Sequence, residues 1–203
     1  MAGIGLSKPV YALYSNSGTT ITYSGYGVLG KAVDFSLSLN DGTSNILYAD
    51  NAPAESDNTF TGGTITITTD DLLPAAVSAI TGVQLTAVTN SGIVDTTTPK
   101  ELIYDDDQVV PYCGMGIIVK KKQGGAIKWV GVVFPKIQFA TPGLSATTQG
   151  ESIEWNTPEI SAIILRDDSA KHTWYRMSTP LDSEADAAAY IAGILNPPAP
   201  VTT

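Results

Sequence analysis

The chain has almost no cysteine or histidine, the residues from which disulfides and thiolate or imidazole metal sites are built. Cys113 is the only cysteine, which excludes an intrachain disulfide, and His172 is the only histidine, which excludes a site with several histidine ligands. No Asn-x-Ser/Thr glycosylation site occurs in the sequence. These absences favour a protein that folds in a reducing compartment, and we expect synthesis in a cytoplasm.

Charged side chains are also scarce, at 15% of residues against a usual share of about 25%. Such a chain hides much of its surface or belongs to an assembly. The formal charge is -9, and all of the excess lies in residues 1–110, which hold 12 acidic and 3 basic residues. Because an acidic field repels phosphate, we do not expect tight binding of nucleic acid.

Long apolar runs are missing as well. No stretch approaches the ~18 apolar residues that a membrane-spanning helix needs. Residues 1–9 lack the basic segment followed by an apolar segment that marks a secretory signal. We therefore expect neither a membrane segment nor a signal peptide.

What the sequence does contain is alternation of apolar and polar residues, the pattern of a half-buried strand. In residues 33–39, Val, Phe and Leu alternate with Asp and Ser, and in residues 64–68 Ile alternates with Thr. Each of these two segments is predicted to be a strand with one very polar face. The polar faces comprise Asp34, Ser36, Ser38, Thr64, Thr66 and Thr68.

The rest of the chain repeats this picture of short strands and turns. Further strands are predicted at 11–14, 19–24, 83–89, 112–121, 126–139, 150–155, 159–166 and 172–177, with turn clusters at 16–18, 90–92, 123–125 and 167–169. Hairpin-like spacing predicts a mainly β fold, an antiparallel β-sandwich or partial barrel. We interpret residues 1–195 as one domain and residues 196–203 as a Pro-rich tail.

Two α-helices are predicted to flank the strands. One runs from about Asp71 to Ile80, with acidic residues 70 and 71 at its positive end, Pro74 in its first turn and Gly82 ending it. The other begins at Ser183, which forms a capping-box pattern with an acidic residue three positions later.

Residues 40–59 separate the two polar-faced strands and are too long for a tight turn. Within them, Ile46, Leu47 and Tyr48 form an apolar cluster that favours docking over free disorder, and Asp50 and Asn51 follow it. Two interpretations stay open: the segment contacts another copy of the chain, or it covers its own core.

Several motifs suggest chemistry, and each has a plainer interpretation. Residues 25–30 match G-x-G-x-x-G, but a strand pattern follows where a dinucleotide site requires a helix. The aspartates at 105–107 lack calcium-loop spacing, and the lysines at 120–122 adjoin a glycine turn, where charge discourages edge pairing. Cys113 is expected to be buried and His172 to lie at the surface. We expect no catalytic, cofactor or metal site.

Two segments resemble a known family. Residues 30–39 (Gly-Lys-Ala-Val-Asp-Phe-Ser-Leu-Ser-Leu) and 45–51 (Asn-Ile-Leu-Tyr-Ala-Asp-Asn) are similar to the major tail protein, or tail-tube protein, of long-tailed phages of Gram-positive hosts. Similar segments lie at 60–64, 70–74, 134–137, 150–154 and 157–158, so the resemblance spans roughly residues 3 to 195.

The resemblance implies a tail-tube fold, a β-sandwich or partial barrel flanked by a helix. It implies hexameric rings that stack into a tube, through which DNA passes without specific binding on its way from capsid to host. The partners implied are further copies of the chain and the tape-measure, tail-tip and tail-terminator proteins, and the location implied is the tail of a virion made in the host bacterial cytoplasm. Some members of that family carry an added immunoglobulin-like domain near the C-terminus, and we expect none after Leu195 here.

On this interpretation the polar faces at 34, 36, 38, 64, 66 and 68 are candidates for the lumen wall. Ile46, Leu47, Tyr48, Asp50 and Asn51 are candidates for contact with a neighbouring ring or subunit. The main alternative is a monomeric secreted β-sandwich for binding or adhesion, in which Trp129, Trp155 or Trp174 would stack on sugars. A hydrolase would need a base and a nucleophile that the sequence does not reveal.

Overall fold

The computed structural model describes residues 2–41, 45–57, 59–88, 99–146, 148 and 156–196. The chain is mainly β, as predicted. Its elements are β1 (Ala2–Ser17), β2 (Thr20–Val28), β3 (Ala32–Asp41), β4 (Asn45–Ala49), β5 (Ala52–Asp57), β6 (Phe60–Thr69), α1 (Pro74–Thr81), β7 (Gln84–Ala87), β8 (Lys100–Ile103), β9 (Tyr112–Gln123), β10 (Ala126–Phe139), β11 (Glu159–Leu165), β12 (Arg176–Met177) and α2 (Glu184–Leu195).

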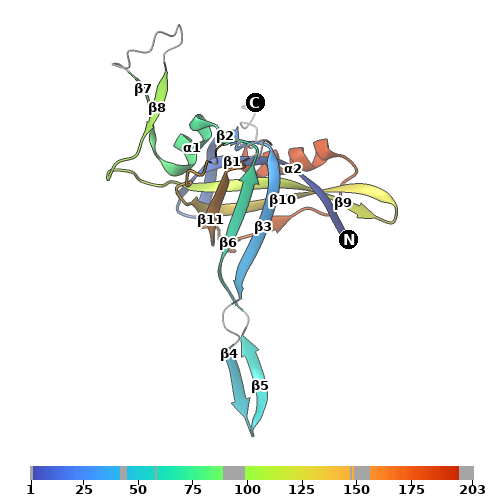
Figure 1. The fold of residues 1–203 in the computed structure, drawn as a ribbon. Helices are drawn as coiled ribbons and strands as arrows, with labels where there is room; N and C mark the ends of the chain where they lie inside the picture. Colours follow the sequence, from blue (N-terminus) through green and yellow to red (C-terminus); the bar gives the residue numbers. More distant parts are fainter. Residues whose placement is uncertain are drawn as a thin grey trace, which may run out of the picture.

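One antiparallel sheet of 8 strands forms the body of the molecule, in the order β2-β1-β9-β10-β11-β6-β3, with β12 pairing to β10. The sheet bends so that β3, β6 and β11 cross one face of β9 and β10 (Figure 1). Between these two layers lies the main core, where Ile65, Ile67, Met115 and Phe134 are fully buried. The predicted antiparallel sandwich with flanking helices is therefore confirmed.

The helix α2 covers the opposite face of β9 and β10, where Ile191 and Leu195 are buried. Glycines allow this close approach: a Cβ atom on Gly116 would lie 2.3 Å from the Cγ2 atom of Ile191, and one on Gly114 would lie 2.6 Å from Leu195. The predicted start is confirmed, because the Ser183 hydroxyl accepts a hydrogen bond from the Asp186 backbone N–H at 3.1 Å.

The helix α1 begins later than predicted. Leu73 precedes a proline and is held in the extended region, with φ -61° and ψ 131°, so the helix cannot start before Pro74. Asp70, expected to interact with the helix N-terminus, instead accepts a hydrogen bond from the Lys31 backbone N–H at 2.7 Å. The predicted end is correct: Gly82, at φ 75°, donates its backbone N–H to the Ser78 carbonyl.

Other boundaries also changed. The segment predicted at 11–14 is the middle of a strand of 16 residues, and the one predicted at 172–177 is reduced to Arg176–Met177. Turn geometry at residues 124 and 125 is as expected, since both glycines have positive φ. Residues 90–92, 150–155 and 197–203 lie outside the described part of the chain.

The glycine contacts predict that Gly116→Ala is destabilising. The added methyl group would overlap Ile191, and overpacking of this kind costs typically about 1–3 kcal/mol. Urea unfolding of the purified protein should show this loss. Gly193→Ala is the matched control, because nothing lies within 4 Å of a Cβ atom there and alanine favours helix. Equal stability of the two variants would contradict the packing described for α2.

Candidate functional site

The polar faces of β3 and β6 form one continuous surface. The two strands are antiparallel neighbours, and their register places each polar residue of β3 opposite a threonine of β6. The side chains at 34, 36, 38 and 64 are exposed, and those at 66 and 68 are half-buried. The cross-strand pairs are Asp34 with Thr68, Ser36 with Thr66 and Ser38 with Thr64.

The strand β11 extends this surface on the other side of β6. Glu159, Ser161 and Ile163 lie opposite Thr68, Thr66 and Thr64. The sequence analysis predicted this strand but did not assign its residues to the polar surface. The signal was the alternation of these residues with Ile160, Ala162 and Ile164, which are all buried. We call the nine paired positions on β3, β6 and β11 the polar face.

Burial fixes the direction of the polar face. Ile65 and Ile67 are 0% exposed and belong to the main core, so the intervening threonines of β6 must point away from it. The same holds for β11, where Ile160 and Ile164 are buried. The polar face therefore carries hydroxyl groups, two carboxylates at residues 34 and 159 and one apolar residue, Ile163, but no lysine or arginine.

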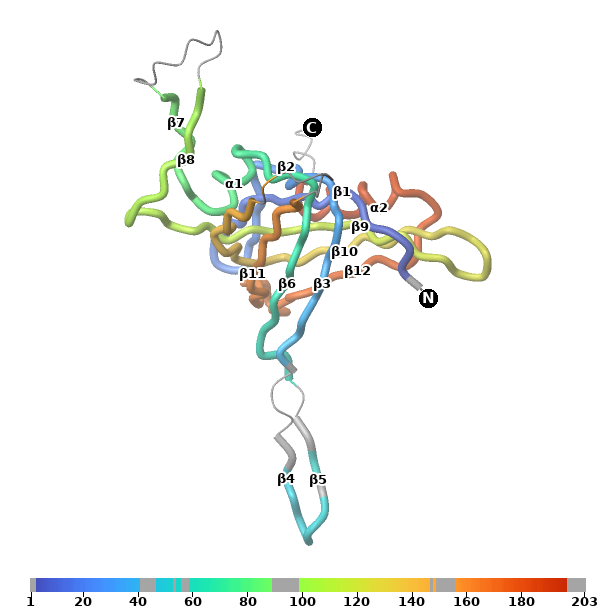
Figure 2. Tube along the Cα trace, viewed as in Figure 1, coloured from blue at the N-terminus to red at the C-terminus, as the bar shows by residue number. Residues whose placement is uncertain are grey.

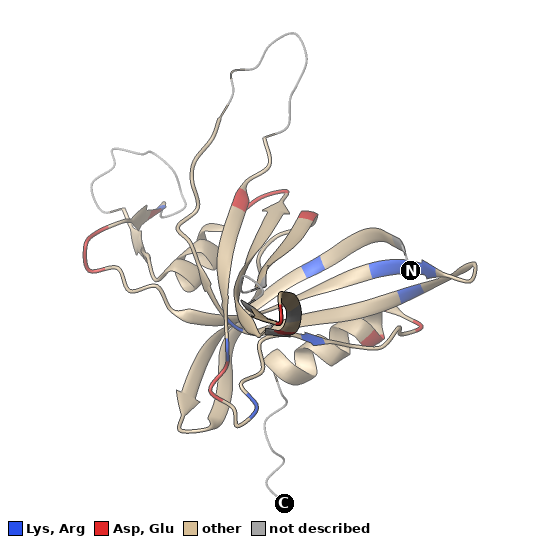
Figure 3. Cartoon of the chain, turned by 90° about the horizontal axis from the view of Figure 1, so that it is seen from below, with Lys and Arg blue, Asp and Glu red and all other residues tan. Residues whose placement is uncertain are grey.

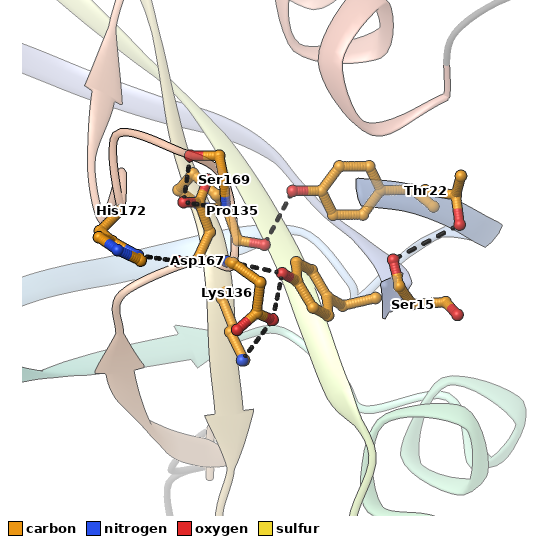
Figure 4. Close-up of polar contacts among 10 residues, drawn as sticks. Ser15, Thr22, Pro135, Lys136, Asp167, Ser169 and His172 are labelled. Atoms are coloured by element: carbon orange, nitrogen blue, oxygen red, sulfur yellow. Dashed lines mark hydrogen bonds and ion pairs between the residues drawn. The ribbon is translucent and has the colours of Figure 1, made fainter. Parts of the chain in front are cut away.

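A lysine does lie on the neighbouring strand β10, but its charge is neutralised. Lys136 alternates with buried residues, and its Nζ atom lies 2.8 Å from the Oδ2 atom of Asp168. The same ammonium group lies 5.1 Å from the ring centre of Tyr14 and 4.8 Å from that of Tyr112. Figure 4 shows Lys136 beside the turn that contains Asp167, Ser169 and His172.

Hydrogen bonds tie this lysine, Tyr14 and the turn together. The Tyr14 hydroxyl donates to the Asp168 carboxylate at 2.7 Å and accepts from the Asp168 backbone N–H at 3.0 Å. The hydrogen bonds from Lys136 and Tyr14 hold the pKa of Asp168 below its usual range. Burial, and to a smaller extent the hydrogen bond to Asp168, raises the pKa of Tyr14 to about 12. We call Tyr14, Tyr112, Lys136 and Asp168 the lysine cluster.

The sequence pattern predicts a loop at residues 40–59. This prediction is wrong, because β4 and β5 form a β-hairpin within the segment. The turn consists of Asp50 and Asn51, with φ 52° and 62°, between the paired residues Ala49 and Ala52. Two positive φ values are the geometry of a two-residue hairpin turn, which Asp and Asn tolerate better than most residues. The hairpin extends away from the sheet, beyond the ends of β3 and β6 (Figure 2).

The apolar side chains of this hairpin do not cover the core of their own molecule. Leu47 is 60% exposed and Tyr48 is 64% exposed. The side chain of Ile46 lies outside the described part, although its backbone pairs with Ser56. The interpretation that the segment shields its own core therefore fails for Leu47 and Tyr48.

The remaining chemical motifs have structural explanations. Cys113 is fully buried, and burial raises the pKa of its thiol to about 12. His172 is exposed and contacts the Asp167 backbone carbonyl, while the Ser169 hydroxyl donates to the Asp167 carboxylate. These three residues therefore lack the serine-to-histidine bond of a catalytic triad. Among the described residues, no group of three metal-binding side chains occurs.

Glycines 25 and 27 of the G-x-G-x-x-G match lie in β2, and the strand β3 follows the last glycine. Two of the three tryptophans also have internal partners. Trp174 stacks on Phe60 with ring centres 4.0 Å apart, and Lys120 lies over Trp129. Trp155 lies outside the described residues.

Comparisons with known proteins give no assignment: no family model matches the chain, and no curated protein matches it. In the parts of the chain that the structure describes, no helix is long and apolar enough to cross a membrane.

The lysine cluster predicts a specific loss of stability in acid. Because the folded pKa of Asp168 is depressed, its contribution is present at neutral pH and is lost as the pH falls through that value. We expect Asp168→Asn to be less stable than the natural chain at about pH 7, with the gap shrinking towards about pH 3. Urea unfolding at several pH values measures this difference in the free energy of unfolding. A gap that is constant over this range would refute the ion pair as its cause.

Proposed function

We propose that the chain is a structural subunit, not an enzyme, which self-assembles into stacked rings that form a phage-type tail tube for DNA. The observation that carries this proposal is the polar face, a surface without a cation whose reverse side on β6 and β11 is the protein core. The resemblance of residues 30–39 and 45–51 supports it and suggests hexameric rings in the tail of a virion.

The sheet edges supply a means of ring formation. In the described part of the chain, β2 and β3 end the sheet, and each pairs with a strand on one side only. Such edges expose unpaired N–H and C=O groups that invite pairing with another copy. If the sheet continues from copy to copy around a ring, the polar face of every copy can turn toward the centre.

The charge on the polar face suits passage of DNA better than binding of DNA. Each lysine or arginine repeated around many rings would add phosphate contacts and hold the DNA in place. The polar face offers hydroxyl groups and the carboxylates of Asp34 and Glu159 instead. The nearest cation on β10, Lys136, is paired within the lysine cluster.

The hairpin of β4 and β5 is proposed to contact the next ring. It extends beyond the sheet and carries two apolar side chains that are more than half exposed (Figure 1). Aromatic and aliphatic anchors of this kind dominate many protein interfaces. The partners of the whole tube, by family resemblance, are tape-measure, tail-tip and tail-terminator proteins.

The first experiment is negative-stain electron microscopy of the purified chain over a concentration series, with light scattering for mass. We expect rings or tubes with a central channel, because the open sheet edges favour pairing between copies. A monomer at every concentration, also with a tail-tip initiator added, would contradict the proposal and favour a monomeric binding module.

A second prediction concerns ring stacking. Leu47→Asp should shorten or abolish tubes while leaving single rings, because a charge would replace an exposed apolar anchor of the hairpin. Tube length in micrographs is the measurement. Leu144→Asp is the control, since Leu144 is 99% exposed and lies outside the hairpin. Tubes of normal length with Leu47→Asp would remove the hairpin from the stacking contact.

A further inference from the structure

The two ends of the strand β9 carry opposite charge. Three aspartates at 105–107 come shortly before the strand, and three lysines at 120–122 lie near its end. A strand of this length spans about 40 Å. Figure 3 shows the acidic segment and the lysines at opposite ends of the molecule. They are therefore too far apart to pair with each other within one copy.

The positive end is a three-stranded extension of the sheet, which we call the basic arm. It consists of the start of β1, the end of β9 and the start of β10, paired through Gly3, Lys121 and Lys128. Two of its cations have partners, because Lys128 pairs with Asp182 and Lys120 lies over the Trp129 ring.

The other two cations of the basic arm are available. Lys121 and Lys122 form no ion pair with any described residue. Beside them, Ile4 is 50% exposed and Ile127 is 48% exposed. The basic arm thus carries uncompensated positive charge and uncovered apolar side chains, with Lys122 and Ile127 on one face of the sheet and Lys121 on the other.

The negative end has the complementary composition, and we call residues 103–109 the acidic segment. Its three aspartates are exposed and form no ion pair with the described residues. Ile103, Tyr104 and Val109 flank them with exposures of 42%, 50% and 79%. Both ends of the molecule therefore join uncompensated charge to uncovered apolar surface, with opposite signs.

We infer that the basic arm of one copy docks on the acidic segment of the next copy. The occupant is a second copy because its acidic segment matches the basic arm in charge and supplies apolar partners for Ile4 and Ile127. Two different surfaces of the chain meet in this contact, so every copy keeps one basic arm or one acidic segment free for a further copy. A constant rotation from each copy to the next then closes the copies into a ring.

This inference rests on the proposed ring and adds the direction in which copies join. Contact between two basic arms, or between two acidic segments, brings like charges together and is disfavoured. Complementary charge of this kind chiefly accelerates correct encounters and rejects wrong ones. Since the patches are exposed, raising the salt concentration should slow assembly of the natural chain.

The test reverses each end separately. An arm-reversed variant carries Lys121→Glu and Lys122→Glu, and a segment-reversed variant carries Asp105→Lys and Asp106→Lys. Sedimentation and negative-stain microscopy measure assembly, and circular dichroism verifies folding. Each variant alone places like charges at the contact, so we expect at least a tenfold loss in the fraction assembled.

Two further samples should restore assembly. A mixture of the two variants can form rings in which they alternate, since each meets an opposite charge on its neighbour. The chain with all four substitutions should assemble alone, because both signs are exchanged. If these samples fail along with the single-end variants, or if the single-end variants assemble normally, the inference is overturned.

The matched control is Lys171→Glu with Arg176→Glu, which changes net charge as much as the arm-reversed variant does. Both residues are exposed, lie outside the basic arm and form no ion pair with the described residues. We expect this control to assemble. If it fails, the loss of assembly in the arm-reversed variant is explained by net charge alone. Rings from the natural chain and from every variant would overturn only this contact, whereas no assembly by the natural chain would count against the ring itself.

Discussion

Burial of β9 and β10 on both faces is the constraint on which the other layers depend. From Cys113 to Ile118 every residue of β9 is buried, with the main core on one side and α2 on the other. A strand covered on both sides reads as a continuous apolar run. Gly114 and Gly116 provide the space for α2, because any side chain there would overlap the helix. The molecule is consequently layered as helix, sheet and sheet.

The layering leaves an outward sheet surface formed by β3, β6 and β11. The strands β6 and β11 bury the face that meets β9 and β10, whereas on β3 Phe35 is half-buried and Val33, Leu37 and Leu39 stay exposed. Hydroxyl side chains at alternate positions keep this surface hydrated without positive charge. The lysine cluster likewise leaves no free positive charge at Lys136 on β10, because Asp168, from a turn distant in the sequence, neutralises it.

Local pattern predicted the features that depend on neighbours along the chain. Alternation at residues 33–39 and 64–68 identified the two polar-faced strands, and the capping pattern at Ser183 identified the start of α2. Pairing between distant segments could not be predicted, because local sequence does not encode which strand lies beside β6 or that Tyr14 meets Asp168. The hairpin turn at Asp50 and Asn51 was missed because neither residue is the glycine that usually marks such turns.

The surfaces proposed for assembly are physically separate, so the roles proposed for them are independent. The hairpin of β4 and β5 extends from one end of β3 and β6, whereas the basic arm and the acidic segment lie at the two ends of β9 (Figures 2 and 3). A change at one of these surfaces should therefore leave the other proposed contacts intact. Stacking and ring closure should accordingly fail one at a time.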